Sequence, residues 1–293
     1  MSFQPMPIIV GSPRSGTTLL RLMLDAHPHL AIPPETGFLI SGKRFNERQK
    51  DVVKTFFQTI TKYPPDAPAW NDFHIPATDY YRRLLEIRPF SAPDGFRLFY
   101  KMYAERFGKS RWGDKTPLYA HHLIAIQDLL PEAYFIHIIR DGRDTAISLR
   151  EQWFSPGNDI ITQAQFWKEN VLTAHSQGKQ CHHYMEIRFE DLIQHSEHTL
   201  RQICDYIELD FDPHMISHHK NASSRLQEHL ERRKADGSLL VSQSTRQNQQ
   251  RSSSQPPNEL KIGVWKNLLN SDEIHKFESI AGDTLQAYGY EIR

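Results

Sequence analysis

A glycine-rich turn near the start of the chain restricts the fold more than any other sequence feature. Residues 7–10 (PIIV) form a short apolar run that is typical of a buried parallel strand. The turn, residues 11–18 (GSPRSGTT), leads into residues 18–26, where leucine and methionine recur at helical spacing. Backbone N–H groups of such a turn, with the helix N-terminus behind them, form an anion-binding site. The sequence therefore predicts an α/β fold that opens with an anion-binding strand–loop–helix unit.

The turn departs from the phosphate loop of nucleoside-triphosphate enzymes at one position. The general pattern is GxxxxGK(S/T); Gly11, Gly16 and Thr18 match it, but Thr17 stands in place of the lysine. That lysine normally reaches the β- and γ-phosphates, so we expect a ligand with a shorter 5′-phosphate chain. Arg14 instead places a cation inside the turn. A strand–helix turn without special chemistry is the alternative interpretation.

Further strands alternate with helices along the chain. Residues 134–139 and 182–189 have the apolar or alternating character of strands, and residues 142–153 follow the first of them as a helix. This alternation is typical of a three-layer fold with a central parallel sheet and helices on both faces. We interpret residues 1–293 as one domain.

Two segments stand apart from this alternation. We interpret residues 37–110 as a helical insertion on the side of the site that binds the second substrate, the acceptor. Two apolar stripes lie within it at helical spacing: Val52, Val53, Phe56, Phe57 and Ile60, and Phe96, Phe99, Tyr100, Tyr103 and Phe107. They indicate either plain helix packing or the wall of a substrate pocket. Residues 236–258 are rich in Ser, Gln, Asn, Arg and Pro, so we expect a mobile loop there.

A second candidate anion site follows the strand at residues 134–139. Arg140 lies at the carboxyl end of that strand, where ligands of open α/β sheets bind, and Ser148 lies about two turns into the next helix. An arginine and a hydroxyl so placed can hold a phosphate by charge-assisted hydrogen bonds. The alternative is a surface ion-pair cluster of Arg140, Asp141, Arg143 and Asp144.

These motifs together resemble those of PAPS-dependent sulfotransferases. Residues 13–18 are similar to the family's 5′-phosphosulfate loop, and residues 11–36 to the branch that contains tyrosylprotein and many bacterial sulfotransferases. The spacing from Arg140 to Ser148 matches the 3′-phosphate motif. The resemblance implies a P-loop-type fold with a C-terminal lid and 3′-phosphoadenosine-5′-phosphosulfate (PAPS) as co-substrate, with no metal required. It implies nucleotide contacts from Arg14, Ser15, Gly16, Thr17, Thr18, Arg140, Ser148, Lys261, Gly263, Trp265 and Lys266.

The C-terminal part of this resemblance is incomplete. Residues 262–267 (IGVWKN) are similar to the segment that closes over the nucleotide, but Val264 replaces a common acidic residue and an upstream Arg-Lys-Gly is absent. Arg251, Ser252–Ser254 and Lys261 are candidates to substitute. The tyrosylprotein-type pattern has a further arginine where this chain has Gln152, and Arg150 lies two residues away, so that contact is not carried over.

Two charged residues are candidates for the chemistry of sulfuryl transfer. Glu35 follows the apolar residues 30–32, which we expect to form the strand next to residues 7–10, and its carboxylate can accept a proton from a hydroxyl. The resemblance implies that Glu35 is the general base and that Lys115, together with Arg14, lies near the sulfuryl group. A surface glutamate and a solvated lysine are the alternatives.

Histidine is the competing base. His121 and His122 follow Lys115 closely enough to reach the site, and cytosolic sulfotransferases use a histidine. Two further pairs, His182/His183 and His218/His219, lack the Cys or carboxylate partners of a zinc site. We therefore expect no metal site.

The composition removes several other classes of function. The formal net charge is +0, with 35 basic and 35 acidic residues, so we expect no nucleic-acid partner. No apolar run of membrane-spanning length occurs, and two cysteines without a signal peptide indicate free thiols in the cytoplasm. The resemblance implies a hydroxyl acceptor on a small molecule or peptide, and the oligomeric state is left open. A P-loop kinase or NTPase, and a non-catalytic 3′,5′-ADP- or PAPS-binding protein, are the rival functions.

Overall fold

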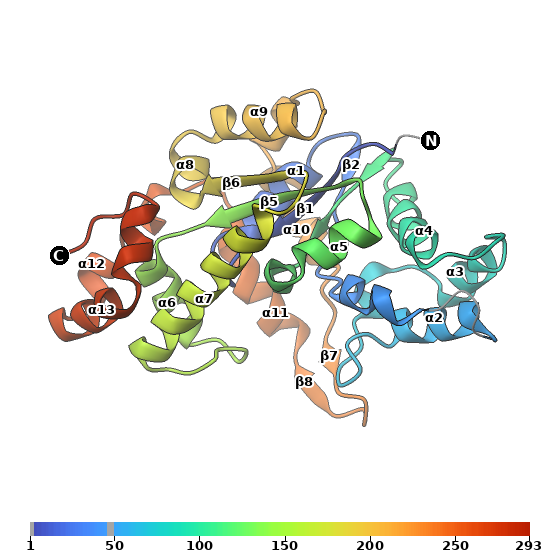
Figure 1. The fold of residues 1–293 in the computed structure, drawn as a ribbon, viewed down its shortest axis with the longest axis horizontal. Coiled ribbons are helices and arrows are strands. Elements are labelled where there is room, and N and C mark those ends of the chain that lie inside the picture. The colour runs from blue at the N-terminus through green and yellow to red at the C-terminus, as the bar shows by residue number, and fades with distance from the viewer. Residues whose placement is uncertain (1–2, 46–49) are drawn as a thin grey trace.

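A parallel four-stranded sheet lies at the centre of the protein. The structure is a computed structural model that describes residues 3–45 and 50–293 (Figure 1). The strand order is β4-β1-β5-β6, all parallel. Their bounds are Asp114–Lys115 for β4, Met6–Val10 for β1, Ala133–Ile139 for β5 and Tyr184–Arg188 for β6. The parallel α/β fold expected from the sequence is confirmed.

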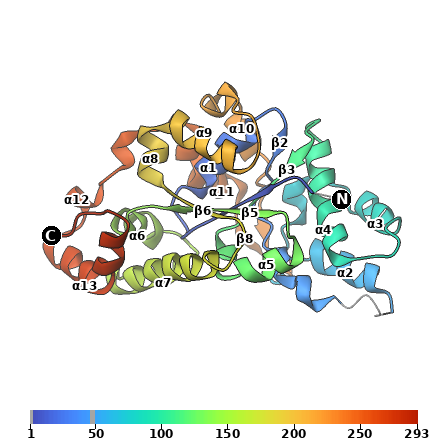
Figure 2. The same ribbon diagram turned by 45° about the horizontal axis from the view of Figure 1, so that its top comes forward.

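Helices cover both faces of this sheet, as Figures 1 and 2 show. One layer contains α1 (Thr17–Asp25), α8 (Phe189–Gln194), α9 (Ser196–Tyr206), η4 (Pro213–Met215) and α10 (His219–Leu226). The other contains α5 (Leu123–Leu129), α6 (Gly142–Arg150), α7 (Ile160–Gly178), α12 (Trp265–Leu268) and α13 (Ser271–Ala287). Neighbouring residues of β5 belong to separate apolar clusters, Ile136 toward α1 and Phe135 toward α4 and α5, because successive side chains of a strand point to opposite faces.

Residues 37–45 and 50–110 pack as a helical unit beside the sheet (Figure 1). Its elements are η1 (Phe38–Arg44), α2 (Val52–Thr61), η2 (Trp70–Phe73), α3 (Ala77–Leu84) and α4 (Ala92–Glu105). Phe96, Phe99 and Tyr100 of α4 are fully buried, and Phe38 packs against all three. Helix packing therefore accounts for this aromatic stripe, whereas Phe107 lies beyond the end of α4 and is exposed.

The strand that precedes Glu35 is not the neighbour of β1, contrary to the sequence-based expectation. β2 (Leu30–Ala31) pairs with β3 (Arg111–Trp112), and β4 takes the place beside β1. Gly113 connects β3 to β4, and a Cβ atom at this position would lie 2.6 Å from the Pro7 carbonyl oxygen. Strands of two residues have no apolar run to reveal them, so the sequence could not place β4.

Residues 236–258 contain regular structure where we expected a loop. β8 (Leu239–Val241) pairs with β7 (Arg232–Arg233), and α11 (Gln243–Gln250) and η5 (Arg251–Ser254) follow. Helix α11 buries none of its residues, which explains why it lacks an apolar stripe. The Ser242 hydroxyl accepts a hydrogen bond from the Thr245 N–H and caps the helix start. The mobility of the segment stays a prediction.

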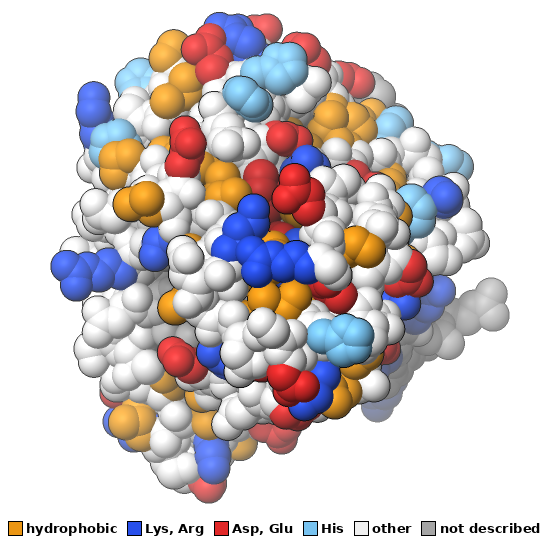
Figure 3. Space-filling model, turned by 90° about the vertical axis from the view of Figure 1, so that its left-hand side faces the viewer, with side chains coloured by type: hydrophobic (Ala, Val, Ile, Leu, Met, Phe, Trp, Pro, Cys, Tyr) orange, Lys and Arg blue, Asp and Glu red, His pale blue; other side chains and the backbone are white. Residues whose placement is uncertain are grey.

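The surface has a mixed character. On the face drawn in Figure 3, basic, acidic and apolar side chains are interspersed, in line with the balanced composition. No described helix is long and apolar enough to cross a membrane. Cys181 and Cys204 are free thiols, as expected.

Candidate active site

The glycine-rich turn joins β1 to α1 at the carboxyl edge of the sheet. A Cβ atom at Gly11 would lie 2.5 Å from the Ile138 carbonyl oxygen, and one at Gly16 would lie 2.4 Å from the Phe189 ring. Both positions also have positive φ angles, +153° and +97°. Arg14 adopts φ 71°, a left-handed conformation that costs a non-glycine residue about 1–3 kcal/mol. The turn therefore keeps a strained backbone that directs Arg14 toward the space above the sheet.

A cavity of about 1360 Å³ opens at this edge. Its volume exceeds the ~300–1000 Å³ of ordinary small-molecule sites, so it has room for two substrates. The predicted residues that line it are Arg14, Gly16, Thr17, Thr18, Glu35, Lys115, His121, Arg140, Ser148 and Lys261. Ser15 is buried but does not line the cavity. The structure thus gathers three separate sequence motifs around one space.

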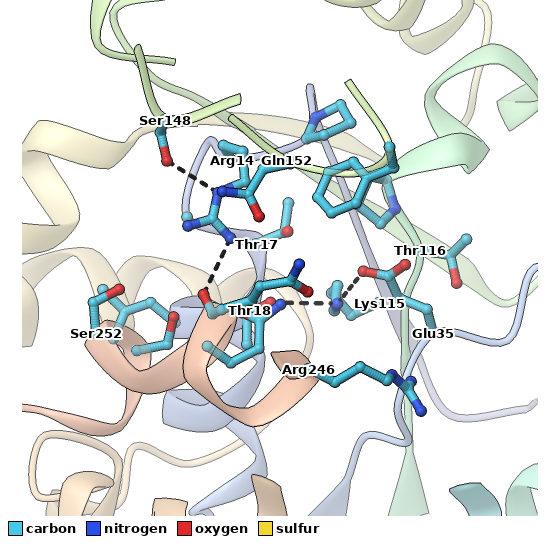
Figure 4. Close-up of a pocket in the computed structure, with 18 of the residues that line it drawn as sticks. Arg14, Thr17, Thr18, Glu35, Lys115, Thr116, Ser148, Gln152, Arg246 and Ser252 are labelled. Atoms are coloured by element: carbon cyan, nitrogen blue, oxygen red, sulfur yellow. Dashed lines mark hydrogen bonds and ion pairs between the residues drawn. The ribbon is translucent and has the colours of Figure 1, made fainter. Parts of the chain in front are cut away.

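Arg14 and Ser148 meet across this cavity (Figure 4). The Arg14 Nε donates a hydrogen bond of 3.0 Å to the Ser148 hydroxyl, and its Nη1 donates to the carbonyl of Gln249 at 3.3 Å. Burial and the neighbouring Arg140 lower the pKa of Arg14. The two anion sites inferred separately from the sequence are therefore adjacent, and α11 touches them through Gln249.

Arg140 occupies the carboxyl end of β5 and is buried. It donates to the Arg14 carbonyl at 3.3 Å and to the Lys261 carbonyl at 2.7 Å, and its Nε has no hydrogen-bond partner among the described residues. Burial lowers its pKa, against the opposing effect of Asp144, 3.7 Å away. The hydroxyls of Ser12 and Ser15 in the nearby turn also lack hydrogen-bond partners among the described residues, but neither residue lines the cavity. A buried donor without a partner at the cavity, such as the Arg140 Nε, is typical of a site completed by a ligand.

The ion-pair cluster considered as the alternative exists in part. Arg140 makes one long ion pair, 3.7 Å from Asp144, whereas Arg143 lies 2.8 Å from Asp141 and 2.6 Å from Glu278, with its guanidinium stacked over the ring of Trp265. Arg143 does not line the cavity. One arginine of the motif is therefore structural, and Arg140 is available to an anion.

Glu35 and Lys115 form the second charged group of the cavity (Figure 4). The Lys115 Nζ lies 2.5 Å from Glu35 Oε1 and 3.4 Å from the Thr18 hydroxyl. Lys115 is 2% exposed, and burial lowers its pKa although Glu35 opposes this. The Glu35 side chain is 52% exposed toward the cavity. Its partial burial disfavours the charged form, but Lys115 together with Arg246 and Arg232 outweighs this, and the pKa of Glu35 lies below its ordinary value. Thr17 occupies the position of the lysine of other phosphate loops, and Lys115 of β4 thus places an ammonium group in the cavity instead.

A buried polar network holds Glu35 in position. The Thr36 hydroxyl donates to Asp114 at 2.6 Å, and the Thr36 N–H donates to the Thr116 hydroxyl at 3.1 Å. Asp114 and Lys115 are adjacent on β4, so their side chains point to opposite faces. One residue of the strand therefore binds Thr36 while the next binds Glu35, which fixes the carboxylate beside the ammonium.

The histidines divide into three cases. His121 lines the cavity, with its Nε2 3.1 Å from Asn170 Oδ1. His122 does not line it. His229, which the sequence analysis missed, lines the cavity, and its Nδ1 accepts a hydrogen bond of 3.1 Å from Arg246. Burial, followed by nearby cations including Arg246, holds the pKa of His229 well below its ordinary value, so this imidazole is neutral.

The C-terminal segment departs from expectation. Trp265 is buried beneath Arg143 and, like Gly263 and Lys266, does not line the cavity. The N–H groups of Gly263 and Trp265 donate to Asp144 at 2.8 and 2.9 Å. This placement corrects the expected direct contacts of all three residues with a nucleotide. They anchor the chain to α6 and leave Lys261 facing the cavity.

An ion-pair cluster closes the far side of the cavity and was not foreseen. Arg246 of α11 makes two hydrogen bonds with Asp72, of 2.9 and 2.8 Å, and Arg232 donates to the same carboxylate at 2.8 Å. Arg232 and Arg246 line the cavity. Their partner lies 160 or more positions away in the chain, so no local pattern could reveal it.

Sequence comparison identifies the family. A profile described as the Sulfotransferase family matches residues 5–213, which covers β1, the glycine-rich turn, Lys115, Arg140 and Ser148. The chain belongs to this family. Sulfonate transfer is the family's general reaction, so the protein is an enzyme. Among residues 3–45 and 50–293, no group of three His, Cys, Asp or Glu side chains is arranged to hold a metal ion.

Several named proteins are similar to this sulfotransferase. A putative protein-tyrosine sulfotransferase from Caenorhabditis briggsae is 24% identical over 99% of this chain and 90% of its own length. The nodulation protein NoeE from Sinorhizobium fredii is 30% identical, over 52% of this chain and 33% of that protein. Protein-tyrosine sulfotransferase A from Caenorhabditis elegans is matched over 52% of its length. The chain therefore spans only part of some relatives.

Solved structures share the fold. The sulfotransferase domain of the Synechococcus PCC 7002 olefin synthase gives a TM-score of 0.60 at 19% identity, over 99% of this chain and 96% of that one. The sulfotransferase domain from the curacin biosynthetic pathway gives 0.58 at 19% identity, with full coverage of both chains. These likenesses place the chain in the P-loop-type sulfotransferase fold.

Proposed function

We propose that this enzyme transfers a sulfuryl group from PAPS to a hydroxyl acceptor, with Glu35 as general base. The observation that carries the proposal is the arrangement of cations and one carboxylate around a single cavity: Arg14 and Arg140 in one part, Lys115 and Glu35 in the next. We call the part lined by Arg14, Arg140 and Ser148 the donor end, and the part beyond Glu35 and Lys115 the acceptor end. Because lining residues run from Pro13 to Leu268, we treat the chain as one functional domain.

The residues of the donor end fit a nucleotide with two separate phosphate groups. The turn N–H groups and Arg14 are suited to the 5′-side phosphosulfate. Arg140 has an unpartnered Nε, and together with Ser148 it is suited to the 3′-phosphate. Lys261 and residues 251–253 line the same end and are the substitutes for the missing Arg-Lys-Gly. A nucleoside triphosphate is disfavoured, because Thr17 replaces its lysine.

The acceptor end fits proton removal from a hydroxyl. PAPS supplies the sulfuryl group when it is bound. Glu35 is ionised beside Lys115, so its carboxylate can take the acceptor proton as the acceptor oxygen attacks. Lys115 and Arg14 place positive charge where negative charge develops on the departing phosphate oxygen. The residues of the helical insertion that line the cavity are Tyr63, Pro64, Asp66, Ala67 and Ala69, which supports an acceptor-side role for residues 37–110.

The test combines binding and turnover. Calorimetry should show 3′,5′-ADP binding, and purified protein should transfer labelled sulfuryl from PAPS to hydroxyl compounds. Failure to bind 3′,5′-ADP would remove the donor assignment. Binding without transfer to any acceptor, with Glu35→Gln indistinguishable from wild type, would favour a non-catalytic nucleotide-binding protein.

A further inference from the structure

Large apolar side chains line the opening of the cavity although they are open to solvent. Leu118, Trp153, Phe154 and Leu240 are between 36% and 57% exposed, and all four line the cavity. They come from three separate segments: η3 (Pro117–His121), the chain that follows α6, and strand β8. A solvent-exposed apolar side chain is common when it stands alone. Four of them around one opening indicate a surface that a ligand covers.

This apolar rim adjoins the reactive groups. Leu118 follows Lys115 by three residues, with Thr116 and Pro117 between them also lining the cavity. On the opposite side, Val241 pairs with Arg232 in the β7–β8 hairpin and lines the cavity beside Leu240. An acceptor with its hydroxyl at Glu35 therefore extends its remaining atoms between η3 and β8.

The charges at the acceptor end balance one another. Three cations, Lys115, Arg232 and Arg246, and two carboxylates, Glu35 and Asp66, line the cavity, and a third carboxylate, Asp72, is buried behind the two arginines. Lys115 is paired with Glu35 at 2.5 Å, and the two arginines share Asp72 at 2.8 Å. His229 adds no charge, because its Nδ1 accepts a hydrogen bond from Arg246. An anionic acceptor would have to displace an existing ion pair, since a buried charge without a partner is costly.

We propose that the acceptor is an uncharged alcohol or phenol with a large apolar body, which packs against Leu118, Trp153, Phe154 and Leu240. This inference rests on the proposed sulfotransferase function and specifies its substrate class. An acidic tyrosine peptide and a sugar are the competing classes. Binding an acidic peptide would require cations at the acceptor end that are not already paired with carboxylates. Binding a sugar would require many polar groups in place of the apolar rim.

The first experiment measures acceptor binding to the complex with 3′,5′-ADP. Probes are the linear primary alcohols from butanol to decanol, 2-naphthol, glucose and a tyrosine peptide flanked by aspartates. Affinity should rise by about fourfold per methylene, the equivalent of ~0.8 kcal/mol for each buried group, until the apolar rim is filled. It should change little between 50 and 300 mM salt, because no ion pair forms. Tighter binding of the acidic peptide, weakened by salt, would overturn the inference, as would a flat alcohol series.

The second experiment uses matched variants. Leu118→Gln should weaken decanol binding about tenfold and butanol binding by less than threefold, with 3′,5′-ADP affinity unchanged. Leu85→Gln is the control, because Leu85 is similarly exposed (40%, against 48% for Leu118) and lies outside the cavity. Equal losses for both alcohols would contradict the apolar contact. The experiments distinguish the proposed function from the proposed substrate class. Failure to bind 3′,5′-ADP would contradict the sulfotransferase function itself. Binding of 3′,5′-ADP with sulfation of the peptide alone would contradict only the apolar acceptor.

Discussion

The donor and acceptor ends of the cavity are built by different means. The donor end comes mainly from two strand-to-helix junctions at neighbouring strand ends, residues 11–18 between β1 and the start of α1 and residues 140–148 from the end of β5 into α6. Its glycines are required by contacts with Ile138 and Phe189. The acceptor end depends on side chains far apart in sequence, such as Arg246 and Asp72, which are separated by 174 positions.

This difference has consequences for rigidity. The donor turns continue directly from strands whose residues are buried, so the whole sheet holds them in place. Helix α11, the cover that lines both ends of the cavity, buries no residue; it is attached at the acceptor end by the Arg246–Asp72 ion pair and at the donor end by the Gln249 carbonyl, which accepts a hydrogen bond from Arg14. Low-stability segments of this kind open before the core does. Apart from this shared cover, changes at one end of the cavity should therefore leave the other end largely intact.

The largest effect is expected from substituting Glu35, which should change catalysis without changing nucleotide binding at the donor end. Glu35→Gln should lower kcat by about 10²–10⁴-fold, the range of a general base, and leave 3′,5′-ADP affinity within twofold. Turnover assays and calorimetry measure the two quantities. His121→Ala and His122→Ala are the comparison variants. Near-normal turnover in Glu35→Gln, with a collapse in either histidine variant, would move the base from the carboxylate to an imidazole.

The pH profile distinguishes the same two bases without mutation. Burial opposes ionisation of Glu35, but the combined effect of Lys115, Arg246 and Arg232 lowers the pKa of its carboxyl. The base is therefore ionised above its depressed pKa, and kcat should fall only below the ordinary glutamate value of about 4.3. A histidine base would lose activity as pH falls through about 6.5. Stopped assays from pH 4 to 8, corrected for unfolded protein, decide between them.

At the donor end the expected effect is smaller. Arg140→Ala should cost about 1.5–3 kcal/mol of 3′,5′-ADP binding, as for a hydrogen bond to a charged group. This corresponds to roughly 10–150-fold in the dissociation constant. Affinity for 5′-AMP should hardly change, since it lacks the 3′-phosphate, and wild type should bind 3′,5′-ADP far more tightly than ADP or 5′-AMP. If calorimetry showed that the wild-type protein binds 3′,5′-ADP and 5′-AMP with equal affinity, Arg140 and Ser148 would not bind the 3′-phosphate.

The donor end could be predicted from the sequence much better than the acceptor end. The turn at residues 11–18 and the spacing from Arg140 to Ser148 are local patterns, so the fold and the donor end were predictable. Lys115 was found through resemblance, but its strand was not, because β4 has two residues and no apolar run. Arg232, Arg246 and His229 gave no signal, since only tertiary contacts bring them to the cavity. Trp265 was misplaced because an aromatic beside a motif packs as readily into the core as onto a ligand.

A further prediction tests whether the cover is the mobile part of the molecule. Residues 236–258 should exchange amide hydrogens quickly without ligand and several-fold more slowly with 3′,5′-ADP, because Gln249 and residues 251–253 adjoin the donor end. Arg246→Leu should speed exchange in α11 further, while β1 and β5 stay protected. Hydrogen exchange with mass spectrometry reports both. Exchange in this segment that does not respond to 3′,5′-ADP would mean that it is not a lid.

The smallest effect is expected from removing divalent metal. Thr17 replaces the lysine of nucleoside-triphosphate loops, and the proposed donor has no β,γ-phosphate bridge for Mg²⁺ to clamp. In the proposed reaction Arg14 and Lys115 meet the charge on the departing phosphate oxygen; the Lys115 ammonium lies within reach of Glu35 and the Thr18 hydroxyl. EDTA should therefore change the rate of sulfuryl transfer by less than twofold, and added Mg²⁺ should not raise it.

The control is Lys115→Met, which should lose activity that Mg²⁺ does not restore, because the cation at this site comes from β4. Inactivation by EDTA with rescue by Mg²⁺ would show that the donor end works as in a kinase, with a metal ion sharing the role assigned to Arg14 and Lys115.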